Sequence, residues 1–172
     1  MTSSADTKGV KFRSYNAATA TFAKELGITP VQIEAAELSQ ALATGVAESF
    51  ISSGSTGYDR KVWEHLSHYY KVNAWLPRNY VIVNKGVWNN LDDGTRSAVQ
   101  KAADETGAAC AAKSAQLANW YFEQLESNGM KVEDASPAFL KELQAIGAKM
   151  QSDWLAAVGS DGQAIIDAYK AM

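Results

Sequence analysis

Short apolar runs alternate with helical patterns over the first 52 residues, and this alternation limits the chain to a small set of folds. The strand-like runs are residues 10–14, 29–33 and 46–52, and the helical stretches between them are residues 18–27 and 36–45. A strand–helix–strand–helix–strand order favours parallel strands that are joined by crossover helices. The sequence therefore predicts an α/β fold with a parallel sheet.

Arg13 stands at the end of the first expected strand, directly before the chain turns into a helix. In parallel sheets, ligands bind beyond the carboxyl ends of the strands, and Ser52 and Ser53 end another strand of the same sheet. By composition alone, an edge residue paired with a surface carboxylate is the better interpretation of Arg13. Its guanidinium also suits bidentate recognition of a bound carboxylate, so an anion site is the functional hypothesis.

The stretch "SSGSTG" at 52–57 is rich in hydroxyl groups and glycine. It is either a flexible turn before a helix or a set of donors suited to an anion. Aromatic residues are also frequent before residue 85. They are Tyr15, Tyr58, Trp63, Tyr69, Tyr70, Trp75 and Tyr80. Most are expected in the core or between lobes, and one or two could line an apolar pocket.

The rest of the chain predicts a long helix with shorter elements on both sides. The expected elements are a short helix beginning in 58–70, extended pieces over 70–85 that include the strand-like 79–84, a helix from about 95 to 128, a strand at 130–134, and helices over 136–158 and 161–172. Asp92 or Asp93 is expected to cap the long helix and Ser136 the following one. Gly107 suggests a kink in the long helix unless this helix spans two lobes.

Charge and motifs exclude several kinds of function. The net charge of −3 argues against nucleic-acid binding, which depends on lysine and arginine. The single cysteine, Cys110, is expected to be a packing residue on a helix. No known catalytic motif is present. His65 and His68 could share a helix face but lack a third metal ligand, so no metal and no cofactor are expected.

Targeting signals are not visible in the sequence. No stretch reaches the roughly 18 apolar residues that a membrane span needs. The first residues, "MTSSADTKG", lack the apolar region of a signal peptide, so we expect no export signal in the chain as written.

Several segments resemble, in order, the C-terminal half of the periplasmic solute-binding proteins of TRAP transporters, the DctP-type family. The segments are "DTKGVKFRSYN" (6–16), "ELGITPVQI" (25–33), "AELSQALATGVAESFISS" (36–53) and "KVWEHLSHYYKVNAWLPRNYVIVNKGVWNNLDDGTRSAVQKAADE" (61–105). The most specific parts are the "KGVKFR" strand and the "VNKGVWNNLDD" entry to the long helix. The resemblance runs from about Asp6 to the end.

The resemblance implies a type II periplasmic-binding-protein-like fold of two α/β lobes around a deep cleft, with crossing strands and a long spanning helix. It implies a periplasmic, non-enzymatic protein that binds an organic acid and delivers it to a sodium-coupled membrane permease. Arg13 falls on the family's arginine that pairs with the substrate carboxylate. Ser52 falls about where many members carry an asparagine, Asn16 and Ser53 lie close by, and Trp75 would suit a larger or aromatic acid.

The resemblance also implies a division of the chain and a truncation. We expect a ligand-binding lobe at 1–70, crossing strands with part of a first lobe at 71–91, the spanning helix at 92–128, and a C-terminal part at 129–172. The family's first units are missing, so apolar surface that would meet them is expected to be exposed. The alternative function is therefore a truncated interaction module that forms homo-oligomers and binds no small molecule.

Overall fold

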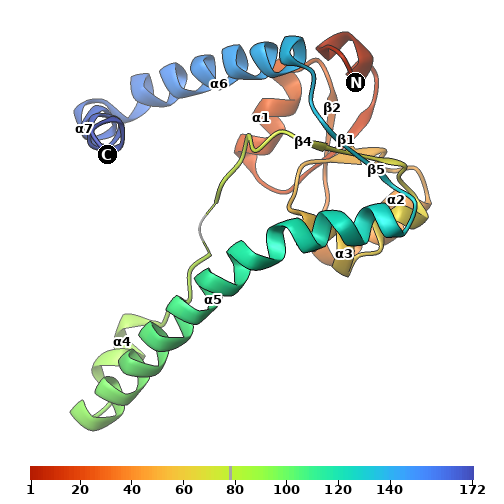
Figure 1. Cartoon of the computed structure of the whole chain (residues 1–172). Coiled ribbons are helices and arrows are strands. Elements are labelled where there is room, and N and C mark those ends of the chain that lie inside the picture. Colours follow the sequence, from red (N-terminus) through yellow and green to blue (C-terminus); the bar gives the residue numbers. More distant parts are fainter. Residues whose placement is uncertain (78) are drawn as a thin grey trace.

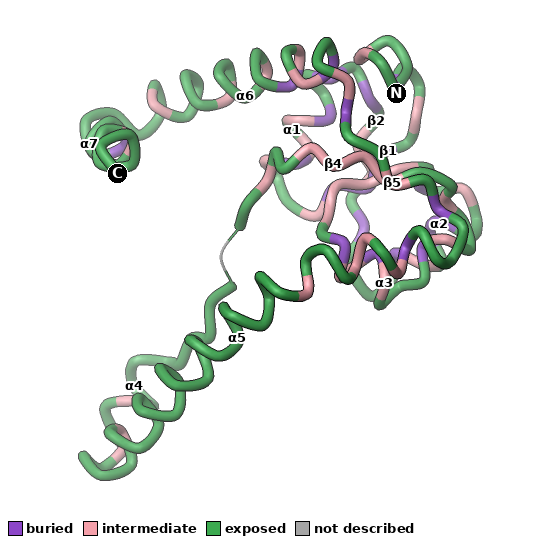
Figure 2. Tube along the Cα trace, viewed as in Figure 1, coloured by how far each residue is buried: buried purple, intermediate pink, exposed green. Residues whose placement is uncertain are grey.

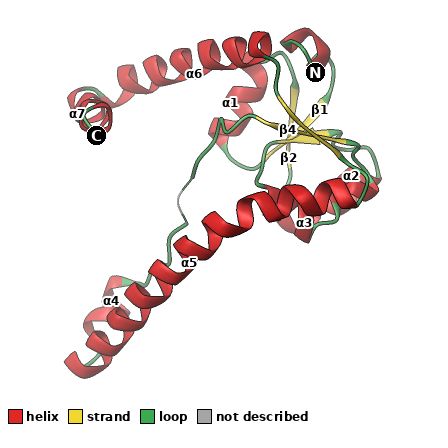
Figure 3. Cartoon of the chain, in the orientation of Figure 1, coloured by secondary structure: helices red, strands yellow, loops and turns green. Residues whose placement is uncertain are grey.

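Short strands and helices alternate along the first third of the chain, as the sequence predicts (Figures 1 and 3). The structure is a computed structural model that describes residues 1–77 and 79–172. The elements in chain order are η1 (Ser4–Thr7), β1 (Lys11–Ser14), α1 (Ala17–Glu25), β2 (Thr29–Gln32), η2 (Ala35–Glu37), α2 (Leu38–Ala43), β3 (Ser49–Phe50), α3 (Gly54–Asp59), η3 (Val62–Glu64), β4 (His68–Lys71), α4 (Lys85–Asn89), α5 (Asp93–Ser127), β5 (Lys131–Asp134), α6 (Pro137–Val158) and α7 (Ser160–Lys170).

Strand β1 lies at the centre of a parallel sheet with the order β2-β1-β3. The register places Arg13 beside Val31 on one side and Phe50 on the other. A second parallel pair joins β4 to β5. These two strands are neighbours in space, although the whole of α5 separates them along the sequence. These parallel pairings confirm the predicted α/β fold class.

Local signals explain where the helices begin and end. Asn16 caps α1, because its Oδ1 accepts a hydrogen bond of 2.8 Å from the backbone N–H of Thr19. Gly27 follows α1 with φ of +76°, a left-handed conformation that a residue with a Cβ rarely adopts. The side chains of Asp92 and Ser136 cap α5 and α6 in the same way as Asn16, which confirms both predicted caps.

Two apolar clusters hold the elements together, one on each face of the first sheet. Phe12 of β1 belongs to a cluster with residues of α1 and the first turns of α6, such as Ala23 and Phe139. The other cluster contains Ile33, residues of α2, and Leu125 from the end of α5. Both long helices therefore anchor only one end in the core, and Figure 2 shows most of the rest of α5 and of α6 exposed.

The first two thirds of α5 extend away from the sheets together with α4, and the second half of α6 extends in another direction with α7 (Figure 1). Helix α5 is helical throughout, including Gly107. Cys110 lies on this exposed part, so its expected packing role is wrong. Among the described residues, no helix has both the length and the apolar character that crossing a membrane requires.

The predictions for residues 58–84 agree with the structure only in part. The short helix expected to begin in 58–70 is α3, which starts earlier and ends at Asp59; a 3-10 turn and strand β4 follow it, because β4 finds a distant partner in β5. The strand-like run 79–84 forms no strand and is exposed, since none of the described segments pairs with it. The expected strand at 46–52 is also shorter, with only Ser49–Phe50 in the sheet.

Candidate functional site

Arg13 is the buried cation of the molecule's central strand. It lies on β1, one residue before the carboxyl end of that strand, and only 4% of its surface is exposed. Neighbouring side chains of a strand point to opposite faces, so Arg13 and Phe12 face different sides of the sheet. Because charged residues are almost never buried unless they are paired, the surroundings of Arg13 need an explanation.

Two contacts hold the guanidinium of Arg13. Its Nε–H donates a hydrogen bond of 2.9 Å to the backbone carbonyl of Ile33, just beyond the end of β2. Its Cζ lies 4.9 Å from the centroid of the Tyr15 ring, within the range of a cation–π interaction. These contacts use the Nε–H of the guanidinium and place its Cζ over an aromatic ring, which holds its head at the carboxyl edge of the sheet.

No carboxylate of the residues at 1–77 and 79–172 forms an ion pair with Arg13. Desolvation by burial lowers the pKa of its guanidinium, and the nearby Tyr15 and Glu34 side chains act in the opposite direction. An arginine keeps its charge even so, because its ordinary pKa is far above neutral pH. Among the described residues, the buried guanidinium therefore has no carboxylate within ion-pair distance, and Glu34 acts on it only from further away.

The terminal nitrogens of Arg13 remain open to a ligand. Within the described part of the chain, neither Nη1 nor Nη2 donates a hydrogen bond to another residue. Among the described residues, every side-chain nitrogen or oxygen that is fully buried has a hydrogen-bond partner. Because Nη1 and Nη2 have no such partner, they cannot be fully buried and keep access to the surface. Two parallel N–H donors on one accessible edge match the two oxygens of a carboxylate.

Asn16, Ser52 and Ser53 lie at the same edge of the sheet as Arg13, since they follow β1 and β3. Asn16 is exposed, and its Oδ1 is engaged in capping α1. Ser53 caps α3, where its Oγ accepts a hydrogen bond of 3.3 Å from the backbone N–H of Thr56. Ser52 is half-buried. Some of the hydrogen-bonding groups at this edge are therefore already engaged in capping helices α1 and α3.

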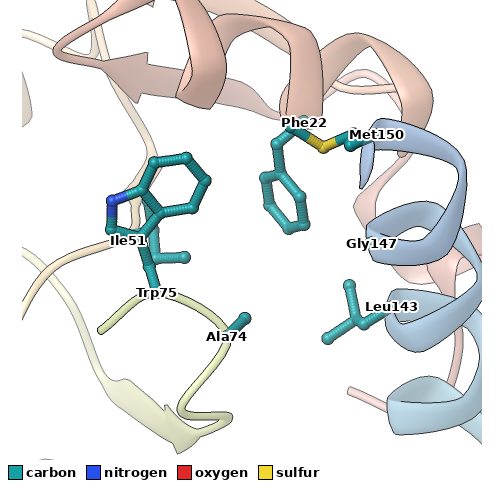
Figure 4. A pocket seen from close by; sticks show the side chains of 7 residues that line it. All are labelled: Phe22, Ile51, Ala74, Trp75, Leu143, Gly147 and Met150. Carbon is teal, nitrogen blue, oxygen red and sulfur yellow. The ribbon is translucent and has the colours of Figure 1, made fainter. Parts of the chain in front are cut away.

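Trp75 lies on the other face of the sheet from Arg13. It lines an apolar pocket of about 230 Å³ together with Phe22, Leu143 and Met150, and their side chains border a common space in Figure 4. Phe22 of α1 and Leu143 of α6 belong to the cluster that packs on the Phe12 face. Ile51, the residue directly before Ser52, lines the same pocket, so Trp75 lies near the chain that leads to Ser52 but on the Phe12 face of the sheet.

The carbonyl of Ile33 is a site group that the sequence reasoning missed, because any residue type supplies a backbone carbonyl. Tyr15 is one of the seven aromatic residues that the sequence offers as candidates. The signal that could have selected it is its position two residues after Arg13, because residues i and i+2 of an extended chain lie on the same face.

The two histidines are not on one helix. His65 follows the 3-10 turn η3, and His68 begins β4, where it stacks on Tyr70. Across the described part of the chain, no three His, Cys, Asp or Glu side chains gather as metal ligands would.

Comparison with known proteins found a family model and a set of solved structures. The model described as "Bacterial extracellular solute-binding protein, family 7" (DctP) matches residues 1–158. A TRAP solute-binding protein from a marine metagenome, from an unidentified microbe, is described as specific for pyroglutamate and was crystallised with it. It is 84% identical over 100% of this chain and 57% of its own, with a TM-score of 0.97.

Two receptors of Bordetella pertussis described as binding pyroglutamic acid are also similar. DctP6 is 41% identical with a TM-score of 0.97, and the match covers 100% of this chain and 57% of DctP6. DctP7 is 36% identical with a TM-score of 0.96, over 99% of this chain and 56% of DctP7. The present chain thus spans little more than half the length of these proteins. A comparison with curated proteins found no match.

Proposed function

The chain belongs to family 7 of the bacterial extracellular solute-binding proteins, and from this membership we propose that it binds a small organic acid through Arg13 for a TRAP transporter. The observation that carries the proposal is the buried guanidinium of Arg13 with two open terminal nitrogens and no carboxylate partner in the described chain. A carboxylate that enters from the carboxyl edge of the sheet forms two charge-assisted hydrogen bonds with Nη1 and Nη2.

Pyroglutamate is the ligand that we propose. Three similar proteins, at 84%, 41% and 36% identity, are described as binding it. It carries one carboxylate, which balances the single charge of Arg13, and a lactam with one N–H and one carbonyl. The hydroxyl groups of Ser52 and Ser53 and the free amide N–H groups of Asn16 are suited to the lactam, and these assignments are part of the proposal.

Trp75 is assigned a different role in this proposal. A ligand of this size on the Arg13 face does not extend through the sheet to the apolar pocket between α1 and α6. We therefore assign Trp75 to the wall of this apolar pocket rather than to contact with the carboxylate. The family's periplasmic location and its sodium-coupled permease partner are likewise proposals for this chain, as is its division at residues 70, 91 and 128.

A thermal-shift titration with L-pyroglutamate tests the Arg13 assignment. A ligand that binds only the folded state raises its melting temperature with concentration. Each lost charge-assisted hydrogen bond costs about 1.5–3 kcal/mol, so Arg13→Ala is expected to weaken binding by roughly a hundredfold or more. Arg13→Lys keeps the charge but loses the planar fork. We expect it to bind L-pyroglutamate more weakly than the parent and more tightly than Arg13→Ala.

Arg60→Ala is the matched control, because Arg60 is an exposed arginine after α3. It should titrate like the parent chain. Equal pyroglutamate affinity for Arg13→Ala and the parent would contradict the carboxylate clamp. A panel of aliphatic and aromatic acids in the same assay identifies the ligand class if another acid produces the larger shift.

Self-association is a second candidate function, favoured by an exposed apolar run after β4. The exposed fractions are 77% for Tyr80, 104% for Val81, 89% for Ile82 and 54% for Val83. Apolar patches of this kind commonly mark interaction sites. Sedimentation velocity of the ligand-free chain tests this function. An oligomer that forms as the concentration rises and that Ile82→Lys dissociates supports self-association, whereas a monomer at all concentrations excludes it.

A further inference from the structure

The guanidinium of Arg13 has many torsional states, and a carboxylate site needs one of them. An arginine side chain loses considerable rotamer freedom when it is held in place, and a site that holds it before binding avoids that loss when the ligand arrives. The groups that orient Arg13 therefore influence affinity without touching the ligand. Within the described chain, the contacts of this kind are those with Ile33 and Tyr15.

The hydrogen bond to Ile33 restrains only part of the orientation. It keeps Nε within 2.9 Å of the carbonyl oxygen, but the guanidinium plane can still rotate about the direction of this bond. A ring packed against the guanidinium opposes that rotation. Tyr15 supplies the ring, with Cζ of Arg13 at 4.9 Å from the ring centroid. The two contacts together specify where Nη1 and Nη2 point.

Tyr15 is itself anchored by the start of α1. Its backbone N–H donates a hydrogen bond of 3.1 Å to Oγ1 of Thr19, a residue with no exposed surface. Thr19 is in turn part of the capping arrangement with Asn16. The position of the ring thus depends on a capped helix end, which is a rigid support for a residue beyond the end of a strand.

We propose that Tyr15 is a positioning residue for the anion site: its ring holds the Arg13 guanidinium in the orientation that presents Nη1 and Nη2 to a carboxylate. This inference rests on the proposed function for its effect on affinity. The aromatic ring carries the role, and the hydroxyl group does not. Tyr15→Phe therefore keeps the role, and Tyr15→Met, which has a similar length without a ring, loses it.

Nuclear magnetic resonance of the 15N-labelled 172-residue chain tests the geometry without a ligand. The chain has four arginines, and the Nε–Hε signal that disappears in Arg13→Lys belongs to Arg13. We expect nuclear Overhauser contacts from this side chain to the Tyr15 ring and slow hydrogen exchange of Hε. In Tyr15→Phe the exchange stays slow, whereas in Tyr15→Met it becomes faster because the guanidinium rotates away from the Ile33 carbonyl.

Calorimetric titration with L-pyroglutamate gives the second measurement. A cation–π contact of ordinary strength predicts roughly 3- to 30-fold weaker binding for Tyr15→Met and parent-like binding for Tyr15→Phe. Tyr70→Met is the matched control, because Tyr70 is another half-buried tyrosine whose ring stacks on His68. It should leave both the Arg13 exchange rate and the affinity unchanged. Tyr15→Leu replaces Tyr15→Met if the backbone spectrum of the latter is not that of the folded parent.

The outcomes separate this inference from the proposed function. No Overhauser contact between the two side chains in the parent, or equal exchange rates in the ring-free variants and Tyr15→Phe, overturns the positioning role. Equal loss of affinity in Tyr15→Phe and Tyr15→Met also overturns it, because the hydroxyl group would then be responsible. If the parent chain binds no pyroglutamate, the proposed ligand fails, and the exchange measurements still decide the role of Tyr15.

Discussion

Replacing Gly57 by alanine is expected to stabilise the chain. Gly57 lies inside α3 and is buried against the end of α5. A Cβ at this position would lie 3.4 Å from Cδ2 of Leu125 and 3.5 Å from Cγ2 of Val62, which are ordinary van der Waals distances. The new methyl group therefore enters a space that fits it.

Two effects set the size of this stabilisation. Alanine is favoured over glycine inside a helix by about 0.5–1 kcal/mol, because glycine loses more backbone freedom on folding. Burial of one methyl group adds about 0.8 kcal/mol. The free energy of unfolding should therefore rise by about 1–2 kcal/mol, which corresponds to roughly 2–8 °C in melting temperature for a chain of this length.

Gly54→Ala is the matched comparison, since Gly54 is also a buried glycine of α3. Here the Cβ would lie 3.1 Å from Cβ of Tyr121, an atom that cannot move without the α5 backbone. Overpacking of this kind typically costs about 1–3 kcal/mol. Gly54 also begins the helix, where the gain in helix propensity is small. Gly54→Ala is therefore expected to be less stable than the parent.

Urea unfolding followed by circular dichroism measures both variants. The expected order of midpoints is Gly57→Ala, then the parent, then Gly54→Ala, with similar slopes. A lower midpoint for Gly57→Ala than for the parent would refute the packing that places α3 against α5. A midpoint for Gly54→Ala above that of Gly57→Ala would refute it as well.

Leu125→Ala should lower the free energy of unfolding by about 2–5 kcal/mol in the same assay, because Leu125 has no exposed surface and lies in the cluster that joins α5 to the sheet. A second prediction concerns acid. Hydrogen bonds from Thr95 lower the pKa of the Asp92 carboxyl below its ordinary value of 3.8. A lowered pKa in the folded state contributes stability that is present above the unfolded value and is lost as the pH falls through the folded one. Urea midpoints measured from pH 6 down to pH 2.5 should therefore fall less steeply for Asp92→Asn than for the parent, and parallel curves would contradict the cap.

The predictable parts of the structure are those that depend on neighbours in the sequence. The caps at Asp92 and Ser136 follow from side chains that bond to backbone groups three residues away. Strand β4 could not be predicted in the same way, because its partner β5 is about sixty residues further along. The run 79–84 has the composition of a strand, but a strand also needs a neighbour to bond with, and composition does not provide one.

The site shows the same limit. The position of Arg13 at a strand end is readable from the pattern of apolar residues, and the resemblance to a family suggests its role. Its burial and its bond to Ile33 depend on a carbonyl that lies twenty residues away, just beyond the end of another strand. The composition-based interpretation, an edge arginine paired with a surface carboxylate, is wrong, since 4% of Arg13 is exposed and no described carboxylate pairs with it.

The burial of Arg13 has a consequence for the energetics of binding. Folding has already removed much of the water around the guanidinium, and its contacts with Ile33 and Tyr15 have restricted its torsions. An incoming carboxylate therefore meets a cation in a medium of low effective dielectric constant, where a charge pair is stronger than in water. Most of the desolvation cost that remains at the moment of binding is therefore that of the ligand. The ligand-free protein already carries the other part of that cost, because Arg13 forms no ion pair with a carboxylate of the described residues. A carboxylate should therefore stabilise this edge of the sheet more than a neutral analogue of the same shape.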